Sequence, residues 1–111
     1  MTPRLKSELW VLAQVRLCDR LHIQATVAHK GDPDSGAILV DVEDSQGRHV
    51  VWTQILTVDG ERGWMRGTGP EPVDGPTASA YVARARERDY DIWVLDVWDR
   101  QGKFKLDGPV V

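Results

Sequence analysis

One candidate strand constrains the fold more than any other stretch: "DIWVLDVW", residues 91–98. Successive side chains of a strand point to opposite faces of its sheet. Ile92, Val94 and Trp98 would therefore share one face. Apolar residues would occupy the other face as well: Trp93, Leu95 and Val97. Because an antiparallel sheet usually leaves one face to water, this one needs additional cover. Two helices on opposite faces, or a second copy of the chain, would supply it.

The remaining elements follow from periodicity. Thr2 and Pro3 form a typical helix start, and the helix should run to about Leu21. Its predicted core stripe comprises Leu5, Leu9, Leu12, Ala13 and Leu17. Alternating patterns predict strands over residues 22–29, 37–42, 49–56 and 64–68. A second helix should begin at Thr77 and bury Ala78, Tyr81, Val82 and Ala85.

Two segments of the chain resemble each other. "LVDVEDSQGR" (39–48) matches "VLDVWDRQGK" (94–103) at five positions, including Asp41 with Asp96. Duplication, or convergence on a turn opened by aspartate and closed by glycine, explains the match. The second turn predicts a returning strand over residues 103–106. The predicted fold is α+β, a mainly antiparallel sheet of five to six strands with two helices, in the order α-β-β-β-β-α-β(-β). We expect a single domain over residues 1–111.

Charge and cysteine content exclude several classes of function. The net charge is −3 and the pI is near 5.5, so the chain lacks the basic surface that nucleic acids require. Cys18 is the only cysteine, which rules out an intrachain disulfide and a cysteine-based structural zinc site. No signal peptide or membrane span is apparent. We therefore expect a cytoplasmic location.

The acidic stretch "GDPDSGAILVDVE", residues 31–43, suggests a metal site and fails the test for one. A calcium loop needs an oxygen ligand where Gly36 stands and a glycine where Ala37 stands. A nuclease signature would need an acid, any residue and then a lysine, but Asp41-Val42-Glu43 is followed by Asp44 and no lysine is in place. A turn gives every residue a local role, with Asp32 opening it and Gly36 taking a positive φ. We expect neither a metal nor a cofactor.

The stretch most typical of a binding site is "GERGWMRGTGP", residues 60–70. On a strand, Arg62, Trp64 and Arg66 would point the same way between glycines. Two guanidinium groups beside an indole could grip an anion or a nucleotide. An edge strand protected by its charges is the structural alternative. Cys18 and a histidine four residues later could form a nucleophile pair, although a half-buried cysteine explains them as well.

Four stretches resemble one known family: "PRLKSELWV", "GDPDSGAILV", "ERGWMRGTGPE" and "DIWVLDVWDRQG". The family is a set of short, mainly alphaproteobacterial proteins called domain of unknown function 1491. The resemblance spans nearly the whole chain. It implies a bacterial cytoplasmic protein of this length. It implies no activity, and it supplies no catalytic residues to carry over.

The leading hypothesis is a small interaction or ligand-binding domain without catalysis, paired as a homodimer. The alternative is a small enzyme, or a nucleotide- or phosphate-binding regulator, that uses Arg62, Trp64 and Arg66. Whether the chain is an enzyme is thus left open. A protein or a small anion is the expected further partner, and membranes and nucleic acids are not.

Overall fold

The computed structural model describes residues 5–111, which form two helices and five strands. The elements are α1 (Ser7–Arg20), β1 (Gln24–His29), β2 (Ile38–Glu43), β3 (His49–Leu56), β4 (Arg62–Arg66), α2 (Gly75–Arg88) and β5 (Trp93–Trp98). Their order, α-β-β-β-β-α-β, confirms the predicted α+β class. The single domain over residues 1–111 stays a prediction.

The strands form one mixed, mostly antiparallel sheet in the order β1-β5-β2-β3-β4. β5, the last strand in the sequence, lies between β1 and β2. It runs antiparallel to β1 and parallel to β2, and all other pairs are antiparallel. Both edges of β5 are therefore occupied by other strands. Each of its side-chain rows must then find cover above or below the sheet.

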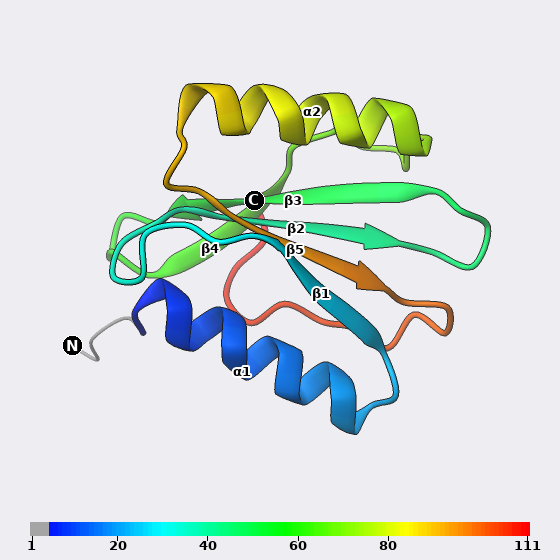
Figure 1. Cartoon of the computed structure of the whole chain (residues 1–111), viewed down its shortest axis with the longest axis horizontal. Helices are drawn as coiled ribbons and strands as arrows, with labels where there is room; N and C mark the ends of the chain where they lie inside the picture. The colour runs from blue at the N-terminus through cyan, green and yellow to red at the C-terminus, as the bar shows by residue number, and fades with distance from the viewer. Residues whose placement is uncertain (1–4) are drawn as a thin grey trace.

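The two helices lie on opposite faces of the sheet, with α1 on one side and α2 on the other (Figure 1). Trp93, Leu95 and Val97 of β5 pack in the cluster that includes the buried residues of α1. Ile92, just before β5, packs with Ala78 of α2 in the second cluster. Of the two ways to cover a two-faced strand, the chain uses its own helices. The expected homodimer stays a prediction. Because the two helices already cover β5, this strand no longer supports it.

The predicted sixth strand is wrong, because residues 103–106 do not join the sheet. β5 already has a neighbour on each edge, so a returning strand has no partner there. The segment instead crosses the α1 side of the sheet (Figure 1), where Phe104 and Leu106 pack against the core. It ends beside β4, where Trp64 N–H donates to Pro109 O at 2.9 Å. The N–H of Val111 donates to Trp64 O at 2.8 Å.

Helix α1 buries a different face from the predicted one. The leucines of the expected stripe are exposed, among them Leu9 at 52% and Leu12 at 45%. The buried residues are Ser7, Trp10, Val11, Gln14 and Cys18. The prediction failed because the helix is apolar on several sides. The helix also begins at Ser7, so Leu5 precedes it. The predicted cap at Thr2–Pro3 lies outside the described residues.

The stretch around residues 31–36 is the predicted structural turn. The Asp32 carboxylate accepts Ser35 N–H at 2.8 Å and Asp34 N–H at 3.2 Å. These bonds, led by the one from Ser35, lower the pKa of Asp32. The turn also closes the start of α1, since Glu8 N–H donates to Pro33 O at 3.0 Å. The loop thus serves the fold.

Two details of the turn and cap predictions are wrong. Gly36 does not take a positive φ. A glycine is needed there because a Cβ would lie 2.4 Å from Asp91 O, a backbone atom. Helix α2 begins at Gly75 with Asp74 as its N-cap, and Thr77 N–H donates to the Asp74 carboxylate at 2.8 Å. Thr77 is therefore the capped residue, and the cap stands three positions earlier.

Candidate functional site

Most of the predicted binding surface on β4 is buried. Trp64 is fully buried and Arg62 is 9% exposed. The Arg62 guanidinium lies over the Trp10 ring, 5.4 Å from its centroid, and donates to Leu5 O at 3.2 Å. Both side chains therefore lie in the layer between the sheet and α1. The expectation that they share an accessible face is wrong.

Arg66 is the member of the set that reaches the surface. Its guanidinium lies 5.4 Å from the centroid of Trp52, the residue opposite it on β3, and donates to Gly69 O at 3.2 Å. A Cβ on Gly67 would lie 2.3 Å from the Tyr81 hydroxyl. This glycine thus allows α2 to pack, and it does not open the backbone to a ligand. Ligand binding by Arg62, Trp64 and Arg66 stays a prediction.

The sequence repeat brings a different pair of residues together. β2 and β5 pair in parallel, and the register joins Asp41 to Asp96 with the same spacing as the sequence match. The turns after both strands also correspond. Asp44 accepts Arg48 N–H at 3.0 Å and Asp99 accepts the matching Lys103 N–H at 3.0 Å, and the glycine of each turn, Gly47 and Gly102, takes a positive φ. The predicted turn chemistry is therefore confirmed. Asp41 and Asp96 lie within the strands and take no part in either turn.

A hollow of about 440 Å³ opens over these two aspartates on the α2 side of the sheet. It exists because α2 packs on Leu39 and Val51, and leaves Gln24, Asp96 and Trp98 exposed. We call this the acidic hollow. Its lining residues are Gln24, Thr26, Asp41, Glu43, His49, Ser79, Asp96, Val97 and Trp98.

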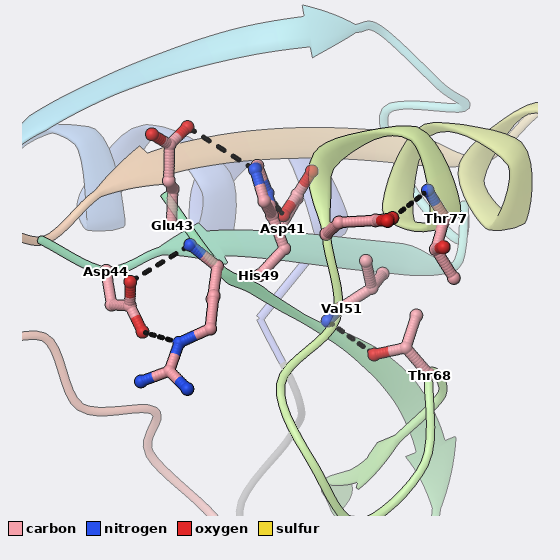
Figure 2. A network of polar contacts seen from close by, with 9 residues as sticks. Asp41, Glu43, Asp44, His49, Val51, Thr68 and Thr77 are labelled. Atoms are coloured by element: carbon pink, nitrogen blue, oxygen red, sulfur yellow. Dashed lines mark hydrogen bonds and ion pairs between the residues drawn. The ribbon is translucent and has the colours of Figure 1, made fainter. Parts of the chain in front are cut away.

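The imidazole of His49 lies between the carboxylates of Asp41 and Glu43 (Figure 2), and all three residues line the acidic hollow. Its Nδ1 is 2.8 Å from the Asp41 carboxylate, and its Nε2 is 3.5 Å from that of Glu43. The His49 and Asp41 side chains are 16% and 14% exposed. The backbone of His49 pairs with Val73 in both directions, at 2.7 and 2.8 Å. The ring is thus fixed against the start of α2.

Asp96 lies at the floor of the acidic hollow, where solvent reaches it. Partial burial by the walls raises the pKa of its carboxyl, and the neighbouring charges of Asp41 and Glu43 raise it further. His49 opposes this effect. Three carboxylates facing one histidine give the hollow a negative potential. Such a site attracts cations, and Asp96 is suited to holding a proton.

The described residues contain no arrangement of three His, Cys, Asp or Glu side chains that could hold a metal ion. Ser79 also lines the hollow, but within residues 5–111 no hydrogen bond joins it to His49. The other candidate nucleophile, Cys18, is fully buried. Burial, with a smaller contribution from the Asp99 charge, raises the pKa of its thiol. It does not pair with His22 as a reactive thiolate.

Sequence reasoning found the members of this site without grouping them. The sequence match pairs Asp41 with Asp96, but no pattern in the sequence links either of them to His49. The sequence match between residues 39–48 and 94–103 was the one signal that could have brought these residues together. If two matching strands lie side by side in parallel, their matching residues become neighbours. Only the placement of β5 beside β2, which the sequence pattern does not specify, turns that signal into a site.

The same fold and much of the same sequence occur in known proteins. A family model described as "Protein of unknown function (DUF1491)" matches residues 5–107. The chain belongs to the DUF1491 family. No curated protein matches it. Within the described residues, neither helix is long and apolar enough to cross a membrane.

Solved structures of similar proteins agree with this assignment. A crystal structure from Caulobacter crescentus CB15 is 37% identical, covers 96% of this chain and 99% of its own, and gives a TM-score of 0.85. An NMR structure of a DUF1491 protein from the same organism is also 37% identical, covers 96% of each chain and gives 0.83. The solution structure of Atu0922 from A. tumefaciens is 28% identical, covers 86% of each chain and gives 0.75. The bacterial family expected from the sequence is thereby confirmed.

Proposed function

We propose that this chain is a small, non-catalytic binding domain of the bacterial cytoplasm, whose ligand carries a positive charge and binds in the acidic hollow. One observation carries the proposal: Asp41, Glu43 and Asp96 converge on a hollow of about 440 Å³. Ligand pockets of roughly 300–1,000 Å³ are typical of small-molecule sites. An ammonium or guanidinium group would be paired with a carboxylate on two of its sides.

The charge of the site decides the class of ligand. Three carboxylates repel the small anion that the sequence suggested as a partner, and of the expected anion-binding set only Arg66 reaches the surface. An organic cation is favoured over a metal ion, because the described side chains offer no three-ligand set. The single free Cys18, which forms no disulfide, supports a reducing location such as the cytoplasm.

A small enzyme is the second candidate, and the state of Asp96 is the observation that favours it. A carboxyl with a raised pKa, beside an aspartate bonded to a histidine, can take up and release a proton. No activated nucleophile accompanies it, so we rank binding first. The regulator based on Arg62 and Trp64 loses support because both side chains are buried.

Calorimetry and thermal unfolding with simple ions test the proposal. We expect spermidine to bind and to raise the melting temperature, and glutarate at the same ionic strength to do neither. Asp96→Asn should remove most of the spermidine effect. Asp59→Asn is the matched control, because Asp59 lies in the exposed turn between β3 and β4, away from the hollow. Equal responses to both ions, or an Asp96→Asn protein that still binds like the wild type, would contradict the proposal.

A further inference from the structure

We propose that the natural ligand of the acidic hollow is an extended basic peptide segment, which pairs with the free edge of β1 as a sixth strand. The inference rests on the proposed function, because it takes the hollow as a cation site. It adds the class of partner and the way that partner is held. Pairing with a sheet edge supplies main-chain hydrogen bonds, while pockets beside the edge select the side chains.

The two edges of the sheet differ. β1 and β4 are the outermost strands. The outer edge of β4 is closed by the chain itself, since Trp64 pairs in parallel with Val110. Among residues 5–111, nothing pairs with the outer edge of β1. One edge therefore already accepts an extended segment, and the other offers free N–H and C=O groups for the same purpose.

β1 carries only one of the features by which edge strands avoid new partners. Charged side chains, prolines and bulges are the usual protections. The sequence of β1, "QATVAH", has no proline, lysine, arginine or acidic residue, and all six residues are at least partly exposed. Its one irregularity is a register shift between Val27 and His29. The regular part, residues 24–27, remains open for pairing.

Space for side chains exists on both sides of this edge. On the α2 side, Gln24 and Thr26 belong to the lining of the acidic hollow. On the α1 side, a second hollow of about 350 Å³ lies between α1 and the start of β1. It is lined by Val15, Arg16, Asp19, Ile23, Gln24 and Ala25. An added strand would send alternate side chains into these two hollows.

The charges on the two sides specify the sequence of the partner. Asp96 lies on β5, two strand spacings or about 10 Å from an added strand, which a lysine or arginine side chain can span toward the carboxylate. At the rim, the Arg100 guanidinium lies 4.0 Å from the centroid of Trp98 and already covers one face of that indole. The hollow on the α1 side of the edge is lined by one positive and one negative side chain, Arg16 and Asp19, and by the apolar Val15 and Ala25. The fitting segment alternates basic residues with small apolar ones.

A second copy of this chain fits the edge less well. Its own β1 contains no lysine or arginine, so pairing two β1 edges would leave the acidic hollow without a counter-charge. A basic peptide supplies both the strand and the charge. The two occupants also differ in stoichiometry, which an experiment can measure.

The probe is the peptide acetyl-Thr-Lys-Val-Lys-Val-Lys-Thr-amide, followed by NMR of the isotope-labelled protein and by calorimetry. We expect one peptide per chain, shifts at β1 amides, and slower hydrogen exchange of the β1 amides that point outward. Two N-methylated peptides, with methyl groups on odd or on even residues, test the strand directly. A strand bonds each neighbour through the N–H groups of alternate residues. The peptide whose methyl groups block the N–H groups that face β1 should therefore not bind. The peptide methylated on the other set of residues should bind.

Variants separate this inference from the proposed function. Asp96→Asn should weaken the lysine peptide roughly threefold to tenfold, and replacing its lysines with norleucine should weaken it similarly. If both methylated peptides bind as well as the parent while Asp96→Asn still weakens binding, strand pairing is refuted and the cation site stands. If the norleucine peptide binds equally well, the cation site is refuted. Concentration-dependent protection of β1 in the protein alone would show that a second copy takes the edge, which overturns the inference.

Discussion

Replacing Gly36 with alanine should destabilise this protein strongly. An added Cβ would lie 2.4 Å from Asp91 O and 2.9 Å from both the N and the O of Asp32. All three atoms belong to the backbone, so no side-chain rotation can make room. The loop must move away from the chain that leads into β5. That movement opens the junction where the loop, α1 and β5 meet.

The cost follows from what the junction holds. Asp32 N–H donates to Asp91 O at 2.9 Å, and the buried Ser7 hydroxyl donates to Gly36 O at 2.5 Å. Overpacking costs about 1–3 kcal/mol, and each lost hydrogen bond adds about 1 kcal/mol. We therefore expect the free energy of unfolding to fall by about 3 kcal/mol. For a domain of this size, this corresponds to a melting temperature lower by about 12 °C.

Gly75→Ala is the matched control. Its Cβ would meet only His49 Nε2, at 3.6 Å, which is an ordinary contact, and Gly75 lies in a helix. We expect its stability to equal that of the wild type or to exceed it by about 0.5 kcal/mol. Urea unfolding of the three proteins measures the difference. If Gly36→Ala unfolds within about 1 kcal/mol of the control, the loop yields without opening the junction, and the reasoning is refuted.

Three further outcomes are expected. Asp96→Asn should raise the free energy of unfolding at neutral pH, because the raised pKa of Asp96 means that its ionised form is unfavourable in the folded protein. Urea unfolding should show this gain disappearing as the pH falls to about 3, where the carboxyl is protonated in both the folded and the unfolded states. Trp64→Phe removes the N–H that donates to Asp107 O at 2.8 Å; it should cost about 2 kcal/mol and speed hydrogen exchange in the C-terminal segment. We expect two copies to pair weakly through the exposed leucines of α1; light scattering should show this association lost in Leu9→Ser/Leu12→Ser with stability unchanged, whereas a wild-type mass that stays monomeric would exclude it.

The strands were predictable because each carries its signal locally. β3 occupies the predicted residues 49–56, and β2 lies within one residue of its predicted bounds. Alternation, turn dipeptides and breakers act over a few residues, so a single sequence contains them. The connection of β5 is not of this kind. No local pattern in residues 91–98 indicates that they enter the sheet between β1 and β2. The sixth strand was wrongly predicted for this reason, because it would have needed a free edge of β5.

The buried face of α1 was not predictable for a related reason. Leu9 and Leu12 are as apolar as the residues that the helix does bury, so periodicity alone cannot choose between the faces. The choice is made by partners far away in sequence. Trp10 packs 5.1 Å from Trp64, centroid to centroid, and its indole donates to Asp107 at 3.1 Å. Those contacts, with Arg62 stacked over Trp10, also explain why Arg62 and Trp64 were wrongly expected at the surface.

The sequence repeat separates structural residues from those that need another explanation. Asp44 and Asp99 each accept backbone N–H groups, so turn formation accounts for them fully. Asp41 and Asp96 form no part of either turn, and side by side they repel each other, which contributes to the raised pKa of Asp96. The fold gains nothing from that repulsion, and apolar or amide side chains would avoid it. A cation bound between the two carboxylates would offset the repulsion, which is the physical reason for proposing a positively charged ligand at this point of the sheet.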